Sequence, residues 1–334
     1  MDTAVQSDWT LERFGAPAGY RVEHHYDSYE EMVASAEFWD FQCTYQMLTG
    51  GYTGCHFVLQ LPTMQYSYAE RDGGFMYRGR SRLDGMNVAV ITRCEGPAVF
   101  DDGKLEEGDI VFFDNSRAYN FMSSGPLSFI IAGIHRDSLG SFSEHLDALL
   151  HRKLKDTDGE FAALLASVRR RCDRGNDPLC GRAHEVVLEY LRQMLKSQTP
   201  FVRRLSRSEK IALEIRDRLY SHMDAVVEIR ALAKEYGISE KSLQNGFRSL
   251  FGFTPKQFIR LLKLNLVHHD LRRAQYGEEK VIRIANRWGF FHMGNFTRYY
   301  KELFGQTPVE TLRQPPPELA AISNLCVERR EEID

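Results

Sequence analysis

The 334-residue chain lacks the features that would place it in a membrane or outside the cell. No run of eighteen apolar residues occurs, so no membrane-spanning helix is expected. The first residues carry neither a basic nor an apolar segment, so they do not resemble a secretory signal. The cysteines are scattered without a Cys-x-x-Cys pair, which is typical of reduced thiols: Cys43, Cys55, Cys94, Cys172, Cys180 and Cys326. We therefore expect a cytoplasmic protein.

Residue patterns for catalysis are missing too. A metal site of the His-x-His…Glu…His kind needs clustered ligands, whereas His56 stands alone and His135 is distant from it in sequence. No Ser-His-Asp or Cys-His signature occurs. The glycine pairs at 50–51 and 73–74 are typical of hairpin turns, not of a phosphate-binding loop. We expect no catalytic residue, no metal and no cofactor, and hence no enzyme.

Positive charge is scarce except in one segment. Residues 203–313 contain 21 Lys and Arg against 12 Asp and Glu, a net charge of +9. The remainder holds 22 basic and 34 acidic residues, a net charge of −12. A basic segment inside an acidic protein indicates a polyanion as the partner of that segment. The alternative is a solvated helical surface that happens to be basic.

Residues 1–137 predict a cupin-like antiparallel β-sandwich or barrel. Short stretches of alternating apolar and polar residues are separated by glycine-containing turns, as in strands with one buried face. The predicted strands are 55–61, 64–70, 87–93, 109–114 and 127–134. Gly108-Asp109 resembles the strand entry of cupin barrels, where the glycine adopts a positive φ and the aspartate bonds the backbone of the turn. With the C-terminal helices described below, the fold class is α+β in two domains.

Aromatic residues at alternating strand positions indicate either an ordinary core or a ligand cavity. In the second case Arg78, Arg80 or Arg93 orients an anionic or polar effector. The candidate effector-binding residues are Tyr66, Tyr68, Tyr77, Arg78 and Phe112.

Residues 138–200 change to helical spacing and predict three helices, over 137–154, 158–172 and 177–197. The last carries an apolar stripe, Val187, Leu188, Leu191, Met194 and Leu195. This stripe predicts either packing against the β-domain or self-association, and we expect the segment to support a homodimer. Pro200 ends the helix, and residues 201–208 form the linker to a domain at 209–314. The tail at 315–334 begins with three prolines and predicts extended or disordered chain.

Two copies of one pattern lie in the basic segment, at 229–258 and 281–313. Each contains Ala-x-x-x-Gly, a short amphipathic helix, and Leu-Phe-Gly-x-Thr-Pro. Ala233 and Ala285 are 52 residues apart, whereas Leu250 and Leu303 are 53 apart, so the second copy has one extra residue in its turn. Each copy predicts a helix-turn-helix, and together they predict a bipartite DNA-binding module.

The outward faces of the two recognition helices carry the side chains that bind DNA. In copy one, Gly237 forms the turn and Ser239 caps a helix over 240–250 that buries Leu243, Phe247 and Leu250. Lys241, Gln244, Asn245 and Arg248 then face outward. In copy two, Phe296, Tyr300 and Leu303 face inward, and Met293, Gly294, Asn295, Arg298 and Lys301 face outward. Lys, Gln, Asn and Arg match base edges and phosphates in the major groove, and Lys256, Arg283 and Lys301 are the candidate phosphate contacts.

An unbroken helical pattern over 256–274 joins the copies. Nineteen residues in a helix span about 28 Å, and recognition helices in successive major grooves lie about 34 Å apart. One monomer is therefore expected to read two adjacent major-groove segments.

This segment is similar to the DNA-binding domain of the AraC/XylS family of bacterial transcription regulators. The diagnostic residues are Ala285-x-x-x-Gly289-Phe290, Asn295-Phe296, Arg298-x-x-x-x-Phe304-Gly305-x-x-Pro308 and Arg313. Lys241, Gln244, Asn245 and Arg298 match positions at which family members contact bases, whereas Met293 and Gly294 depart from the family's polar residues. The departure indicates thinner hydrogen-bonded base readout by copy two. Residues 48–93 are faintly similar to the ethanolamine-operon-regulator subgroup.

The resemblance implies a transcriptional regulator, an activator by type, that binds promoter DNA and RNA polymerase and acts in the bacterial cytoplasm, on the nucleoid when bound. The N-terminal domain would control it through a small-molecule effector, dimerisation or both. One alternative keeps the DNA binding and makes the N-terminal domain an effector-independent interaction module, as in a virulence or quorum-sensing regulator. Another is a cupin-type small-molecule-binding or enzymatic protein, against which the missing metal cluster argues.

Overall fold

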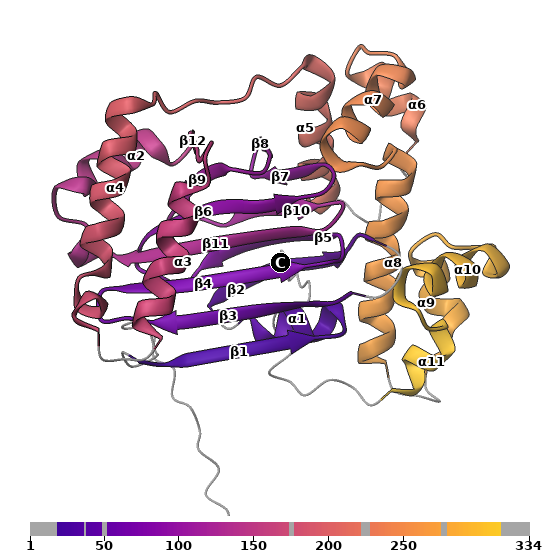
Figure 1. Ribbon diagram of the computed structural model, residues 1–334. Helices are drawn as coiled ribbons and strands as arrows, with labels where there is room; N and C mark the ends of the chain where they lie inside the picture. The colour runs from indigo at the N-terminus through magenta and orange to yellow at the C-terminus, as the bar shows by residue number, and fades with distance from the viewer. Residues whose placement is uncertain are drawn as a thin grey trace, which may run out of the picture.

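The computed structural model describes residues 19–36, 38–48, 52–173, 177–221, 228–274 and 279–314. The tail predicted at 315–334 lies outside these ranges. Two β-sheets form the N-terminal domain, and a group of helices follows it (Figure 1). The structure confirms the predicted class, a β-sandwich joined to an all-helical C-terminal domain.

Every strand pair in the two sheets is antiparallel. The seven-stranded sheet has the order β1 (Arg21–Tyr26), β3 (Gly54–Gln60), β4 (Met64–Arg71), β11 (Leu127–His135), β6 (Gly85–Cys94), β9 (Asp109–Phe113) and β12 (Lys153–Lys155). The five-stranded sheet has the order β2 (Trp39–Gln46), β5 (Phe75–Ser81), β10 (Tyr119–Ser123), β7 (Ala98–Phe100) and β8 (Gly103–Leu105). The five strands predicted from alternation correspond to β3, β4, β6, β9 and β11, which all lie in the larger sheet.

The turn before β9 has the predicted geometry. Gly108 adopts a φ of 78°, in the region that favours glycine. The Oδ2 atom of Asp109 accepts a hydrogen bond from the backbone N–H of Glu106 at 3.1 Å. The glycine and the aspartate therefore close the turn together.

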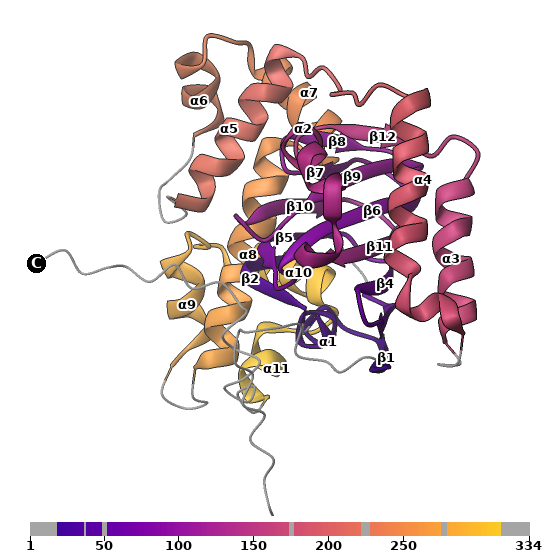
Figure 2. The same cartoon turned by 90° about the vertical axis from the view of Figure 1, so that its left-hand side faces the viewer.

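Helices α3 (Glu160–Cys172) and α4 (Ala183–Ser197) cover the outer face of the seven-stranded sheet (Figure 2). Val187, Leu188, Leu191 and Met194 are buried in one apolar cluster with residues of β4, β6 and β11. The apolar stripe of α4 thus packs against the β-domain, which is the first of the two interpretations of that stripe. Because these side chains are buried within the chain, they do not form an exposed apolar surface.

The long helix predicted over 137–154 is wrong. Short turns replace it: η1 (Arg136–Ser138), η2 (Gly140–His145) and the single helical turn α2 (Leu146–Leu149), followed by β12. Gly140 has a φ of 53°, which interrupts a regular helix. Leu139, Phe142 and Leu149 are nevertheless buried, because a spacing of three residues serves 3₁₀ turns as well as α-helices.

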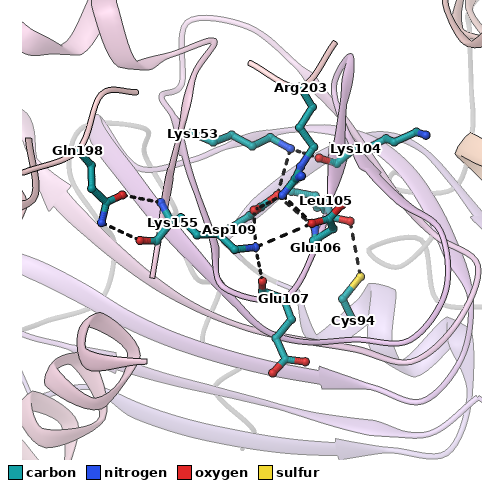
Figure 3. Close-up of polar contacts among 10 residues, drawn as sticks. All are labelled: Cys94, Lys104, Leu105, Glu106, Glu107, Asp109, Lys153, Lys155, Gln198 and Arg203. Atoms are coloured by element: carbon teal, nitrogen blue, oxygen red, sulfur yellow. Dashed lines mark hydrogen bonds and ion pairs between the residues drawn. The ribbon is translucent and has the colours of Figure 1, made fainter. Parts of the chain in front are cut away.

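The segment after α4 is fixed to the N-terminal domain through Asp109 (Figure 3). This carboxylate is fully buried and contacts Arg203 at 2.9 Å, Lys155 at 3.1 Å and Lys153 at 3.4 Å. Burial alone would raise the pKa of Asp109, but the three cations hold it below its usual value. Burial lowers the pKa of Lys153 to about 8 despite this carboxylate. The segment predicted as a linker is therefore anchored at its middle.

Seven helices of the described residues form the C-terminal domain. They are α5 (Arg207–Ser221), α6 (Ile229–Glu235), α7 (Glu240–Phe251), α8 (Pro255–Arg273), α9 (Val281–Arg287), α10 (Met293–Phe304) and α11 (Pro308–Arg313). Both Leu-Phe-Gly-x-Thr-Pro segments have the same structure, because Gly252 and Gly305 end α7 and α10 with positive φ. Thr254 and Thr307 then begin α8 and α11 with capping boxes.

Candidate nucleic-acid interface

The first helix-turn-helix consists of α6 and α7. Gly237 turns the chain with a φ of 61°, and Ile238 packs against the core while its N–H bonds the carbonyl of Ala233 at 3.0 Å. Ser239 caps α7, because its Oγ accepts the backbone N–H of Ser242 at 3.1 Å. The roles of Gly237 and Ser239 were predicted from the sequence and are confirmed.

The outer face of α7 is polar and open to solvent. Leu243, Phe247 and Leu250 are fully buried, which fixes the rotation of the helix about its axis. Lys241, Asn245 and Arg248 are exposed and Gln244 is half-buried, so the four predicted contacts share the opposite side. Within the described part of the chain, neither Lys241 nor Arg248 forms an ion pair with an acidic side chain. Their charges are therefore available for phosphates.

The second helix-turn-helix, α9 and α10, repeats this geometry with differences at the helix start. Gly289 has a φ of 84°, and the N–H of Phe290 bonds the carbonyl of Ala285 at 2.9 Å, as Ile238 does in the first unit. His292 precedes α10 without making a side-chain cap. Phe291, which lies between Phe290 and His292, is the additional residue of this turn.

The outward residues of α10 differ from those of α7 in kind. Asn295, Arg298 and Lys301 are exposed as predicted, whereas Met293 is half-buried and packs partly against the core. The guanidinium of Arg298 lies 4.9 Å from the ring centre of Tyr299 and 4.0 Å from the carboxylate of Glu302. Such an exposed, long ion pair contributes little, so it does not prevent Arg298 from binding a ligand.

Helix α8 holds the two units at its opposite ends (Figure 1). Its 19 residues run without interruption and span about 28 Å at 1.5 Å per residue. Lys256 in its first turn and Arg283 in α9 are exposed, as expected of phosphate contacts. The connecting helix predicted from the sequence is thus confirmed, with bounds shifted by one residue.

The N-terminal domain contacts the middle of α8. The main chain of Gln46 in β2 and the side-chain amide of Asn265 exchange two hydrogen bonds, each 2.8 Å long. The side chain of Gln46 also donates to the carbonyl of Leu303, at the end of α10, at 2.8 Å. Glu30 in α1 (Tyr29–Ser35) accepts from His268 at 2.8 Å and lies 3.2 Å from Arg272.

A second set of contacts holds the first unit. Glu209 in α5 pairs with Lys104 of the β-domain and accepts from Ser249 of α7 at 2.7 Å. Burial would raise the pKa of Glu209, but these donors and the N–H of Ser206 lower it to about 2. Arg216, which is 2% exposed, donates to the carbonyl of Asp101 at 3.0 Å. Sequence reasoning missed the contacts of Glu209 with Lys104 and of Arg216 with Asp101, because no local pattern links positions more than a hundred residues apart.

The predicted effector residues do not line one cavity. Tyr66 and Phe112 lie in the cluster beneath α3 and α4, whereas Tyr77 lies between the two sheets. Tyr68 is half-buried, with its hydroxyl bonded to Glu70 at 2.9 Å, and Arg78 is half-buried. The space between the sheets is filled by aromatic rings, with the guanidinium of Arg71 4.5 Å from the ring centre of Phe75. An effector site at the five residues stays a prediction.

In the part of the chain that the structure describes, no group of three or more His, Cys, Asp or Glu side chains is arranged for a metal ion. None of the described helices combines the length and hydropathy needed to span a membrane.

The pair of units joined by α8 defines a double helix-turn-helix domain. A helix-turn-helix domain family matches residues 232–314. The probable thc operon regulatory protein of Rhodococcus erythropolis is 38% identical over 100 residues, 30% of each chain. The XylDLEGF operon transcriptional activator of Pseudomonas putida is 35% identical over 94 residues, 28% of this chain and 29% of that protein. The chain thus contains a helix-turn-helix domain at 232–314 and is similar over about 100 residues to these two operon regulators.

The chain spans less than a third of the length of these two regulators. Among solved structures, the AraC-like transcriptional activator CuxR aligns with 73% of this chain and 94% of its own, at 14% identity and a TM-score of 0.37. The similarity of residues 48–93 to ethanolamine-operon regulators stays a prediction.

Proposed function

We propose that the protein is a sequence-specific DNA-binding regulator of transcription that reads two adjacent major-groove segments. One observation carries this proposal: two recognition helices with basic and amide side chains outward lie at opposite ends of one continuous helix. Recognition helices of this type place their N-terminal residues against base edges. The net charge of +9 over 203–313 supports binding to a polyanion.

The outward-facing residues divide into two roles. Lys241, Gln244 and Asn245 in α7 and Asn295 and Arg298 in α10 contact bases, with Met293 making an apolar contact. Arg248, Lys256, Arg283 and Lys301 contact phosphates, which position the domain without reading sequence. Amide and guanidinium groups suit adenine and guanine edges in the major groove.

The wider role follows the relatives, which are named as operon regulators and activators. We infer activation of promoters through RNA polymerase, by a cytoplasmic protein that lies on the nucleoid when bound. The N-terminal domain acts as the controlling module, through a small-molecule effector or as an effector-independent interaction module. A homodimer also belongs to this proposal, although its interface does not include the buried stripe of α4.

The test is a selection of binding sites from random-sequence duplex DNA with the full-length chain. We expect enriched sites with two conserved blocks about 10 base pairs apart, on one face of the DNA. Replacing Arg298 with Ala is expected to relax one block and leave the other intact. If no sequence is enriched, or if a single block accounts for all binding, the proposal is wrong.

A further inference from the structure

The turn of the second helix-turn-helix exposes an aromatic side chain that the fold does not use. Phe291 is 73% exposed, more than the other large apolar side chains exposed in the described structure. The core position of this turn is already taken by Phe290, whose ring lies 5.2 Å from that of Phe296. In the first unit Ile238 takes the same position and Ser239 follows it directly as the cap. The one-residue insertion therefore places Phe291 outside the core.

The glycine at position 294, in the helix that follows this turn, also lacks a structural reason. Gly294 lies in the first turn of α10, where glycine favours the helix less than alanine does. A Cβ atom added to Gly294 would meet no atom within 4 Å, so packing within the chain does not require glycine here. Glycine in such a position permits close approach of a backbone to a ligand. The start of α10 thus combines an exposed ring with a surface free of side chains.

The exposed residues beside this surface identify the ligand. Gly294, Arg298 and Lys301 follow one another at helical spacing, so the open surface continues into a basic one. A cationic helix face with an uncovered first turn fits the major groove, where the N-terminal residues of a recognition helix meet base edges. The apolar group in that groove is the C5 methyl of thymine, and phenylalanine is among the side chains that contact it.

We propose that Phe291 reads thymine methyl groups in the half-site bound by α10, with Gly294 allowing the DNA to approach. This inference rests on the proposed function, because it names what the second unit recognises. It also explains why this unit has fewer polar base-reading side chains than the first: part of its sequence preference is apolar.

The test removes the methyl groups alone. A duplex selected by the full-length chain is synthesised with deoxyuridine in place of thymidine, one position at a time. The half-site of α10 is the one whose preference Arg298→Ala relaxes. The wild-type protein is expected to bind about fourfold more weakly for each contacted methyl removed, the effect of burying one methyl-sized group. Phe291→Ala should bind the thymidine duplex about fourfold more weakly and be insensitive to deoxyuridine at the same positions.

Matched controls separate this effect from loss of structure or charge. Val309→Ala truncates another exposed apolar side chain of the same domain, 43% exposed in α11, and should keep the wild-type response to deoxyuridine. Thermal unfolding should be unchanged in Phe291→Ala, and the salt dependence of its DNA binding should keep the wild-type slope, because no phosphate contact is lost.

Three results would overturn the inference. One is equal sensitivity to deoxyuridine in the wild type and Phe291→Ala. Another is the absence of any sensitive thymine in the half-site of α10. The third is a Phe291→Ala variant that binds DNA normally but loses transcription with purified RNA polymerase, which would assign the ring to a protein contact. Failure to select any DNA sequence would instead overturn the proposed function itself.

Discussion

The two helix-turn-helix units share a backbone and differ in what they present to DNA. Their turn glycines, their αL helix ends and the hydrogen bonds from Ile238 and Phe290 correspond closely. At equivalent positions, however, the first unit has Lys241 where the second has Gly294, and Asn245 where the second has Arg298. The first unit begins its recognition helix with a capped, polar turn, and the second with an uncapped turn beside an exposed ring. A duplicated scaffold can therefore hold two different recognition surfaces.

The largest effect should come from the core residues that both units share, where we expect equal losses of unfolding free energy. Leu250→Ala and Leu303→Ala each truncate a fully buried leucine at equivalent positions of the two units, and each should lower the free energy of unfolding by about 2–5 kcal/mol. Chemical denaturation monitored by circular dichroism measures both. A loss below about 1 kcal/mol in one variant would show that the units are not structurally equivalent.

The contacts with the N-terminal domain should differ between the units. Glu209 is buried against Lys104 and Ser249, so Glu209→Gln should cost about 1.5–3 kcal/mol at pH 7. Because the pKa of Glu209 falls from 4.5 to about 2 in the fold, its contribution is present above pH 4.5 and is lost between about pH 4.5 and 2. Denaturation across this range should therefore show a shallower acid loss in the variant than in the wild type.

Glu30 is the corresponding carboxylate near the second unit and is the matched control. Its pKa is also lowered, because its hydrogen bonds with His268 and Arg272 outweigh the effect of burial, but its side chain is 39% exposed. Glu30→Gln should thus lose less stability than Glu209→Gln at pH 7. A larger loss of stability in Glu30→Gln than in Glu209→Gln would contradict the order expected from the burial of the two carboxylates.

Substitutions at the proposed base contacts should have smaller effects, and these effects should differ in kind from that of a substitution at a phosphate contact. Arg298→Ala should cost about 1–3 kcal/mol at one base position of its half-site, and Asn245→Ala should cost a similar amount in the other half-site. Lys256→Ala should instead weaken binding to all sequences alike and reduce the salt slope by about one. Competition binding with single-base variants of a selected site measures these changes. An Arg298→Ala protein with unchanged preference would remove that residue from the site.

The smallest effect is expected for Gly294→Ala, which should raise stability and lower the affinity for DNA. Gly294→Ala should raise the free energy of unfolding by up to about 1 kcal/mol, because alanine favours the helix and meets no neighbour. The same variant should bind DNA more weakly, since the added methyl group occupies the space of close approach. Thermal unfolding and DNA titration on the same sample decide this. A variant that gains stability without losing affinity would show that Gly294 does not face the DNA.

The sequence predicted local structure well wherever short-range chemistry determines it. Gly237, Ser239 and the buried residues of α7 follow from turn geometry, capping and helical spacing, and so does the extent of α8. The helix predicted over 137–154 failed because apolar residues three apart also suit successive 3₁₀ turns. Alternation identified the faces of the strands but not which face meets a helix, so Tyr66 and Tyr77 were grouped although they lie in different clusters.

The candidate site was predicted more completely than the contacts that position it. The exposed residues of a recognition helix follow from the sequence of that helix alone, and they were predicted in this way. The pairing of Gln46 with Asn265 joins residues that are 219 positions apart, so it depends on how β2 and α8 meet in the folded chain, which neither segment encodes by itself. Phe291 was overlooked because one inserted residue changes a spacing without forming a motif of its own.

Helix α8 joins two unlike ends, and this gives the molecule a polarity. A symmetric DNA-binding domain would bind its site in either orientation. Here one unit recognises hydrogen-bonding groups of the bases, and the other recognises methyl groups. The bound protein would therefore point in one direction along the DNA. Inverting a site in front of a gene would reverse that direction relative to the start of transcription, even though every base contact is kept.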